Sequence, residues 1–117
     1  MKYTVSVLQY EPLFLQPEAN LNKLIPMIRG INSDLVVLPE LALTGYVFTT
    51  REEVSRVAES IPDGKCFKAL QKLSEERKIS ICYGFPERED ELFYNSSALI
   101  IPDGTYHIYR KIHLFFR

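Results

Sequence analysis

The sequence has little of what several large protein classes require. Its 117 residues include only two cysteines, no tryptophan and five glycines. Two cysteines cannot form a disulfide scaffold, so we expect a reducing, cytoplasmic location. No apolar run approaches the roughly 18 to 20 residues of a membrane span. Thr4, Ser6 and Gln9 interrupt the stretch where a secretory signal would be apolar. We therefore expect no membrane partner and no secretion.

An excess of one charge is also lacking. The 14 Lys and Arg residues oppose 15 Asp and Glu residues, which gives a formal net charge of −1. Such a chain has no broad basic field, so we expect no nucleic-acid partner. The 46% of apolar and 25% of charged residues are typical of a soluble globular protein. The length fits one small domain over residues 1–117.

Motifs that mark common cofactor and metal sites are absent as well. The sequence has no G-x-G-x-x-G, no G-x-x-x-x-G-K-[ST], no G-x-S-x-G and no H-E-x-x-H. His107 and His113 have no neighbouring cluster of ligand residues. We therefore expect no cofactor and no metal. The glycosylation pattern at Asn95-Ser96-Ser97 is interpreted as chance, since no signal peptide is evident.

The hydrophobic periodicity that is present predicts an α/β fold. Alternation over Lys2–Gln9 predicts a strand, and the apolar run Leu35–Leu38 predicts a strand buried on both faces. Apolar residues at i, i+3, i+4 and i+7 predict a helix from Pro17 to Gly30, despite the interior Pro26. A capping box at Thr50 and Glu53 predicts a short helix to about Ser60.

Another helix and three strands are expected in the second half of the chain. The helix opens near Cys66 and ends near Lys78, and an acidic loop is expected at Glu87–Glu91. The three strands are expected at Ile79–Phe85, Leu92–Ile101 and Thr105–Arg110. The order β-α-β-α-α-β-β-β predicts a mixed sheet with helices on one face.

Glu40 is the first candidate for chemistry. It directly follows the most apolar strand, and α/β folds commonly place ligand sites beyond the carboxyl ends of strands. A carboxylate partly removed from water there would have a raised pKa and could act as a general base. The alternative, which position alone favours, is a strand-end glutamate that faces water or pairs with an arginine.

Lys111 is the second candidate. It follows a predicted strand and precedes the apolar residues Ile112, Leu114 and Phe115. A lysine in apolar surroundings beside a carboxylate could stabilise an oxyanion with its charge. The alternative, again favoured for the residue alone, is a lysine whose stem covers apolar surface while its ammonium group stays in water.

The cysteines and tyrosines carry weaker signals. A thiol becomes a nucleophile only when charge or a helix end lowers its pKa, which leaves a faint case for Cys66 at a helix start. Cys82, between apolar strand residues, is interpreted as a small core residue. Tyr46, Tyr83 and Tyr94 are interpreted as core or pocket wall.

Three segments taken together resemble a known family. Residues 34–46, DLVVLPELALTGY, resemble the first signature of the nitrilase superfamily of carbon–nitrogen hydrolases. Tyr109–Phe115, YRKIHLF, resembles its second signature. The middle of the family is matched by Gly84-Phe85, Glu87, Tyr94-Asn95-Ser96 and Ala98. The three motifs occur in the family's order across nearly the whole chain, so the match is specific. Residues 51–60 and 62–64 also resemble the amidase-like branch.

The resemblance implies a fold, a reaction and two site residues. The fold would be the N-terminal portion of a four-layer α-β-β-α sandwich. The reaction would hydrolyse a small-molecule amide or nitrile through a cysteine thioester. Glu40 corresponds to the general base of the family's Glu-Lys-Cys triad, and Lys111 corresponds to its lysine. A full-length version would be a homo-oligomer, a dimer or larger.

The sequence departs from the family at the nucleophile. The family's catalytic cysteine and a second glutamate lie downstream of the lysine motif, and neither Cys66 nor Cys82 occupies that cysteine's place. The resemblance therefore implies a truncated, partial hydrolase domain over residues 1–117 that is inactive alone. Half a sandwich would leave one sheet face and a strand edge bare, which favours aggregation.

Two main hypotheses on function follow from the sequence. The chain is the N-terminal portion of an amidase-like enzyme, or it is a naturally short, non-catalytic chain that acts as a binding or interaction module. A nucleotide-binding domain is disfavoured because the glycine-rich loop is missing. Simple amides, ω-amides of dicarboxylates, N-carbamoyl compounds and nitriles all remain open as substrates of the first.

Overall fold

The computed structural model describes residues 2–45 and 48–114, and for residues 112–114 only the backbone. The elements follow the predicted order. They are β1 (Val5–Val7), α1 (Pro17–Arg29), β2 (Leu35–Val37), α2 (Arg51–Val57), α3 (Lys65–Arg77), β3 (Ser80–Glu89), β4 (Leu92–Ile100) and β5 (Tyr106–Leu114).

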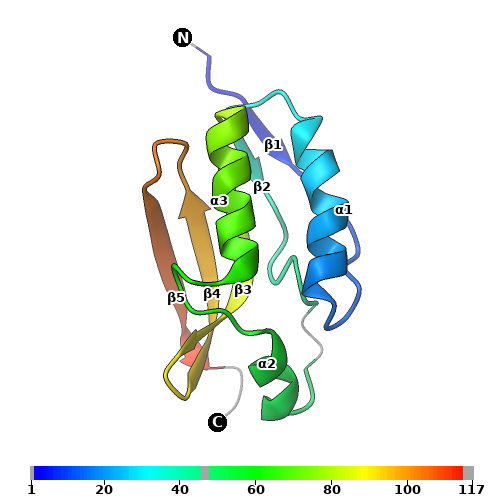
Figure 1. Ribbon diagram of the computed structural model, residues 1–117, viewed down its shortest axis with the longest axis vertical. Helices are drawn as coiled ribbons and strands as arrows, with labels where there is room; N and C mark the ends of the chain where they lie inside the picture. The colour runs from blue at the N-terminus through cyan, green and yellow to red at the C-terminus, as the bar shows by residue number, and fades with distance from the viewer. Residues whose placement is uncertain (1, 46–47, 115–117) are drawn as a thin grey trace.

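The strands form one five-stranded mixed sheet in the order β1-β2-β3-β4-β5. β1, β2 and β3 run parallel, while β4 and β5 are antiparallel to their neighbours. α1 and α3 lie side by side over one face of the sheet, and α2 lies near one end of it (Figure 1). The predicted α/β class, with a mixed sheet and helices on one face, is confirmed.

The core fills the space between the sheet and these two helices. Alternate residues of β3, Ile81, Tyr83 and Phe85, are buried beneath the helices. Leu24 of α1 and Phe67 of α3 are fully buried against the same cluster. Burial of each such side chain contributes roughly 1.5 to 3 kcal/mol. Helix packing therefore fixes β3, the strand along which the candidate site is built.

Two local sequence signals for helices are confirmed, the proline at the start of α1 and the capping box at the start of α2. α1 begins with Pro17 in its first turn and continues through the exposed Pro26. At α2, the Thr50 hydroxyl accepts a hydrogen bond from the Glu53 amide at 3.1 Å, and the Glu53 carboxylate accepts one from the Thr50 amide at 3.2 Å. α2 ends earlier than expected, because the Glu59 backbone bonds to β3 instead of continuing the helix.

The interpretation of Leu35–Leu38 as a strand buried on both faces is wrong. Val36 is fully buried under the helices, whereas Leu35 and Val37 are half-buried on the opposite face. No described element covers that face, where Val7 of β1 is 71% exposed and Tyr109 of β5 is 65% exposed. Within the described residues, this agrees with the expectation of a bare sheet face.

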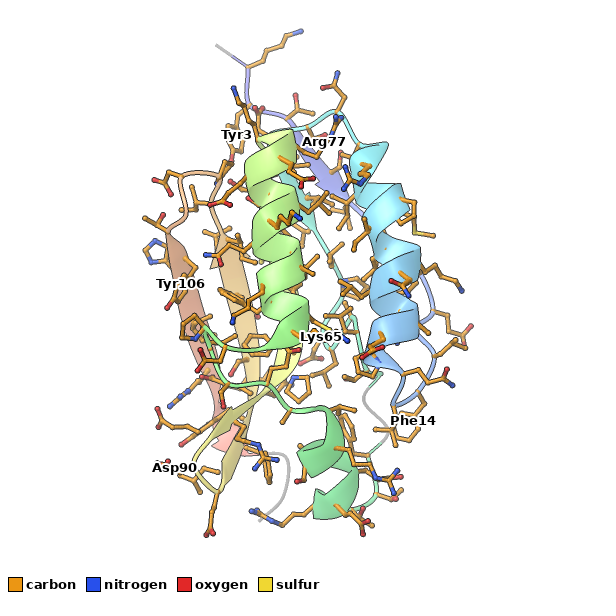
Figure 2. The ribbon with its side chains drawn as sticks, in the orientation of Figure 1. Tyr3, Phe14, Lys65, Arg77, Asp90 and Tyr106 are labelled. Carbon is orange, nitrogen blue, oxygen red and sulfur yellow. The ribbon has the colours of Figure 1, made fainter. Side chains whose placement is uncertain are left out.

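The expected acidic loop at Glu87–Glu91 is also wrong. β3 continues to Glu89, and the turn is confined to the tip of the hairpin, where Asp90 lies (Figure 2). Glu87 and Glu89 remain in the strand because both form ion pairs with Arg110 of β5. β5 likewise extends beyond the predicted strand, so Lys111 lies within it and not after it.

Asn20 is a buried polar residue that joins two loops. Its side-chain Oδ1 accepts a hydrogen bond from the Leu13 amide at 2.8 Å. Its Nδ2 donates to the carbonyl oxygens of Leu13 at 2.8 Å and Leu43 at 2.6 Å. The loop before α1 is thereby tied to the loop after β2, which contains Glu40.

We predict that Asn20→Ala lowers the free energy of unfolding by about 2 to 4 kcal/mol, because it leaves the backbone groups of both loops unpaired. Urea denaturation followed by circular dichroism measures the change. Asn22→Ala, at an exposed position of the same helix, is the matched control and should change stability by only about 0.5 kcal/mol. Equal stability of the two variants would show that the Asn20 side chain does not tie the two loops together.

Candidate active site at the end of strand β2

The backbone beyond β2 holds Glu40 against β3. The Leu38 amide donates to the Cys82 carbonyl at 2.8 Å, and the Ala42 amide donates to the Gly84 carbonyl at 3.2 Å. Leu41 adopts the left-handed conformation, with φ of 50°, and its side chain is buried. The Glu40 side chain is 46% exposed. Its backbone is therefore anchored while its carboxylate remains accessible from solvent.

Gly84 of β3 allows this close approach. A Cβ atom at position 84 would lie 2.8 Å from the Leu41 nitrogen and 2.9 Å from the Glu40 Cα. Both neighbours are backbone atoms, which cannot move aside as the end of a side chain could. Any larger residue at position 84 would therefore displace the segment that carries Glu40.

Lys111 and Asn95 converge on the Glu40 carboxylate. The Lys111 Nζ donates a hydrogen bond to Glu40 Oε2 and forms an ion pair with it, across 71 residues of sequence. The Asn95 Nδ2 donates to the same oxygen at 2.6 Å. Both residues predicted from sequence are therefore in direct contact. In the sequence, Asn95 is marked only by the family resemblance and by a glycosylation pattern, and no local signal indicates this contact.

The expectation that burial raises the pKa of Glu40 is wrong. The hydrogen bond from Lys111 lowers this pKa, as does the hydrogen bond from Asn95, and together they outweigh the opposing effect of burial. The carboxylate is nearly half exposed, so it loses little hydration, whereas its two donors favour the charged form. Glu40 is therefore a carboxylate at neutral pH.

Neither cysteine has the environment of an activated nucleophile. Burial, followed by the nearby Glu59 carboxylate, raises the pKa of the Cys66 thiol to about 12. Burial also raises the pKa of Cys82. Cys66 belongs to the core between helices and sheet, whereas Cys82, interpreted from sequence as a core residue, is only half-buried. A thiolate, the reactive form, is disfavoured at both positions.

The tyrosines, like the cysteines, differ in how deeply they are buried. Tyr83 is buried in the core, as interpreted from sequence, and its hydroxyl has no hydrogen-bond partner among the described residues. Tyr94 is half-buried, and the Arg110 guanidinium lies 4.2 Å from its ring centre. Tyr46 lies outside the described residues.

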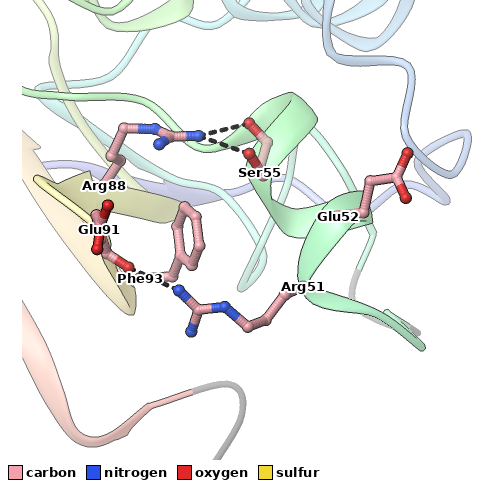
Figure 3. Close-up of a pocket in the computed structure, with 6 residues that line it drawn as sticks. All are labelled: Arg51, Glu52, Ser55, Arg88, Glu91 and Phe93. Atoms are coloured by element: carbon pink, nitrogen blue, oxygen red, sulfur yellow. Dashed lines mark hydrogen bonds between the residues drawn. The ribbon is translucent and has the colours of Figure 1, made fainter.

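A surface hollow between α2 and the β3–β4 hairpin lies apart from these groups (Figure 3). The guanidinium groups of Arg51 and Arg88 each lie 4.9 Å from the Phe93 ring centre. Arg51 donates to the Glu91 carbonyl at 2.7 Å, and Arg88 donates to the Ser55 carbonyl at 2.8 Å. These contacts fasten α2 to the hairpin, and neither Glu40 nor Lys111 lines the hollow.

The described part of the chain has neither a cluster of metal-binding side chains nor a helix suited to a membrane. Residues 2–45 and 48–111 contain no group of three or more His, Cys, Asp or Glu side chains that could hold a metal ion. Among the same residues, no helix has the length and apolar character that crossing a membrane requires.

Comparisons with known proteins give a consistent result. The family model described as carbon-nitrogen hydrolase matches residues 4–117. A nitrilase of Pyrococcus abyssi is 39% identical over 116 residues, which cover 97% of this chain and 44% of the relative. The protein N-terminal amidase of Saccharomyces cerevisiae is 31% identical over 97 residues, covering 81% of this chain and 21% of the relative.

Solved structures agree with these sequence matches. A crystal structure of N-terminal amidase superposes with a TM-score of 0.86 at 26% identity, covering 96% of this chain and 28% of that one. Nit3 of Saccharomyces cerevisiae, a member of branch 10 of the nitrilase superfamily, gives a TM-score of 0.79 at 25% identity, covering 97% and 45%. The chain thus spans less than half the length of these proteins. Its matched sequence and its portion of the nitrilase fold together show that the chain belongs to the carbon–nitrogen hydrolase family.

Proposed function

We propose that this chain is the N-terminal part of an amidase-type carbon–nitrogen hydrolase domain, with Glu40 as general base and Lys111 as the cation that stabilises the oxyanion. The observation that carries the proposal is the convergence of Lys111 and Asn95 on one oxygen of Glu40 in a member of this family. A carboxylate base beside an ammonium group suits acyl transfer through a covalent intermediate.

The two oxygens of Glu40 have different hydrogen-bond partners, which supports a different role for each in the proposal. Oε2 accepts the hydrogen bonds from Lys111 and Asn95. Among residues 2–45 and 48–111, whose side chains the structure describes, none donates a hydrogen bond to Oε1. Oε1 is therefore available for the proton of an incoming thiol, while Oε2 holds the carboxylate in place.

In the proposed reaction on an amide, Glu40 takes the proton of a cysteine thiol as the sulfur attacks the carbonyl carbon. Lys111 stabilises the negative charge that develops on the tetrahedral oxygen of an amide substrate. The proton returns to the leaving ammonia or amine, and a thioester remains. Glu40 then takes a proton from a water molecule that attacks the thioester, which releases the acid and regenerates the thiol.

The ion pair couples these two roles. While Lys111 binds Glu40, it lowers the pKa of Glu40 and keeps the carboxylate ionised, which is the form that a base requires. When the Lys111 ammonium turns toward the oxyanion, Glu40 loses part of this stabilisation. Its affinity for the thiol proton then rises at the moment when the proton must be taken.

The thiol is proposed to come from a segment beyond Arg117. The raised pKa values of Cys66 and Cys82 argue against either as the nucleophile. The substrate is proposed to be a small-molecule amide or nitrile. The low cysteine content suggests a cytoplasmic location, and the family resemblance suggests a homo-oligomer. Relatives with the printed names (R)-stereoselective amidase, 2-oxoglutaramate amidase and omega-amidase favour an amide.

The first prediction from the proposed function concerns the protein expressed from the complete reading frame that encodes this chain. We predict that Glu40→Gln lowers kcat by at least about 10³-fold, because the base is lost. Lys111→Ala should lower kcat by at least about 10²-fold, because the oxyanion loses its cation. Ammonia release from amide substrates gives the rates, and thermal unfolding checks that both variants fold.

Glu91→Gln, at an exposed position of the β3–β4 turn, is the matched control and should leave kcat unchanged. Turnover close to that of the wild type in either folded site variant would refute the assigned roles.

The second prediction concerns residues 1–117 alone. We expect no amide hydrolysis, because burial holds both thiols in the unreactive protonated form. Ammonia release from a panel of amides is the measurement. Activity that co-purifies with the chain and disappears in Cys66→Ser or Cys82→Ser would show that the nucleophile lies within these residues.

The third prediction tests the close approach at Gly84. In the complete protein, Gly84→Ala should lower kcat by roughly 10- to 100-fold, because the added Cβ displaces the backbone of Glu40. Gly30→Ala is the matched control, since its Cβ would meet only the carbonyl oxygens of Met27 and Pro26 at 3.6 and 3.7 Å. Equal kcat values for the two alanine variants would show that Gly84 does not position Glu40.

A further inference from the structure

A partly buried ion pair lies on the helix-facing side of the sheet, behind the candidate site. Glu87 of β3 is only 5% exposed. Arg110 of β5 donates from Nε to Glu87 Oε1 and from Nη2 to Glu87 Oε2, both at 2.9 Å. The hydroxyl of Ser96, on the intervening strand β4, donates to Glu87 Oε1 at 2.7 Å. Three neighbouring strands are thus joined by one carboxylate.

Further contacts hold the Arg110 guanidinium in place. It forms a second ion pair with Glu89 at 3.2 Å, and it lies over the Tyr94 ring at 4.2 Å from the ring centre. Because a guanidinium binds a carboxylate with two parallel hydrogen bonds, its plane and direction are both fixed. Arg110 is therefore held at a defined position relative to β3 and β4.

The ion pair and the candidate site are built from consecutive residues. Arg110 precedes Lys111 on β5, and Ser96 follows Asn95 on β4. Successive side chains of a strand point to opposite faces of the sheet. Arg110 and Ser96 therefore contact Glu87 on the helix side of the sheet. Their neighbours Lys111 and Asn95 contact Glu40 on the other side.

The backbone pairing between β4 and β5 does not fix the position of Lys111. Ser96 pairs with Arg110, but the next pair joins Tyr94 to Leu114, with a register irregularity between them. Two steps along β4 thus correspond to four steps along β5. Lys111 lies within this bulge, where strand pairing alone leaves its position undetermined. The last fixed point before Lys111 is the Ser96–Arg110 pair, which the ion pair fastens.

We propose that Glu87 and Arg110 are positioning residues for the candidate active site: their ion pair fixes the last register point before the β5 bulge and so directs Lys111 and Asn95 onto Glu40. The proposal deepens the proposed function and rests on it for its catalytic meaning. Its test, however, requires neither a substrate nor the nucleophile.

The test reads the pKa of Glu40 directly. Carboxyl ¹³C chemical shifts of Glu40 are followed against pH in the 117-residue chain, for the wild type, Lys111→Ala, Glu87→Gln and Arg110→Lys. Lys111→Ala defines how far the pKa of Glu40 shifts when the ammonium group is lost completely. Arg110→Lys preserves the positive charge but not the two-pronged geometry, and Glu87→Gln preserves the shape of the side chain but not its charge.

We expect both Glu87→Gln and Arg110→Lys to raise the pKa of Glu40, by roughly half of the rise seen in Lys111→Ala. The sign is diagnostic for Glu87→Gln. Removal of a nearby negative charge would by itself lower the pKa of Glu40, so a rise requires that Lys111 has moved away. In Arg110→Lys the charge is unchanged, so any rise likewise reports displacement.

Leu70→Ala is the control for a merely structural role. It opens a cavity in the core at a fully buried residue of α3 and should lower stability while leaving the pKa of Glu40 unchanged. Amide spectra confirm that each variant is folded at the pH values used. If one of the two variants at the ion pair does not fold, the other decides.

An unchanged or lowered pKa of Glu40 in folded Arg110→Lys or Glu87→Gln would overturn the positioning role. This result is distinguishable from failure of the proposed function. If Glu40→Gln kept its turnover in the complete protein, the catalytic assignment would fail, while the pKa measurements would still decide whether the ion pair directs Lys111.

Discussion

The contact between Lys111 and Glu40 is the interaction on which the functional interpretation of this fold depends. The two residues are 71 positions apart in sequence and come from β5 and from the end of β2, with β3 and β4 between them. Gly84 allows the Glu40 segment to lie against β3, and Asn95 of β4 donates to the same carboxylate oxygen. Each strand from β2 to β5 therefore contributes to one contact.

The alternation of side chains places the apolar core on one face of this sheet and the candidate site on the other. The face beneath α1 and α3 holds the apolar core and, near the end of the strands, the Glu87–Arg110 ion pair. The opposite face presents Lys111 and Asn95 to Glu40. A buried carboxylate that is fully hydrogen-bonded can specify register without being exposed to substrate. Glu87 illustrates this, since its hydrogen bonds with Arg110 and Ser96 overcome the effect of burial and lower its pKa.

Local sequence patterns were sufficient for the element order and made Glu40 and Lys111 candidates, and the family resemblance gave these two residues their expected roles. The capping box at Thr50 and the apolar spacing of α1 involve residues within one or two helical turns, so they are visible in the sequence. The continuation of β3 through Glu87 was not visible, because its partner Arg110 lies 23 residues away. The lowered pKa of Glu40 and the role of Asn95 likewise depend on contacts across strands and on the β5 bulge.

The central proposal is that Glu40 and Lys111 serve a thiol that lies beyond Arg117. The most direct measurement is peptide mapping by mass spectrometry after the complete protein has been mixed with an amide substrate and quenched in acid. We predict an acyl adduct on a cysteine downstream of Arg117, and the adduct should be absent in Glu40→Gln. An adduct on Cys66 or Cys82, or an undiminished adduct in Glu40→Gln, would contradict the claim.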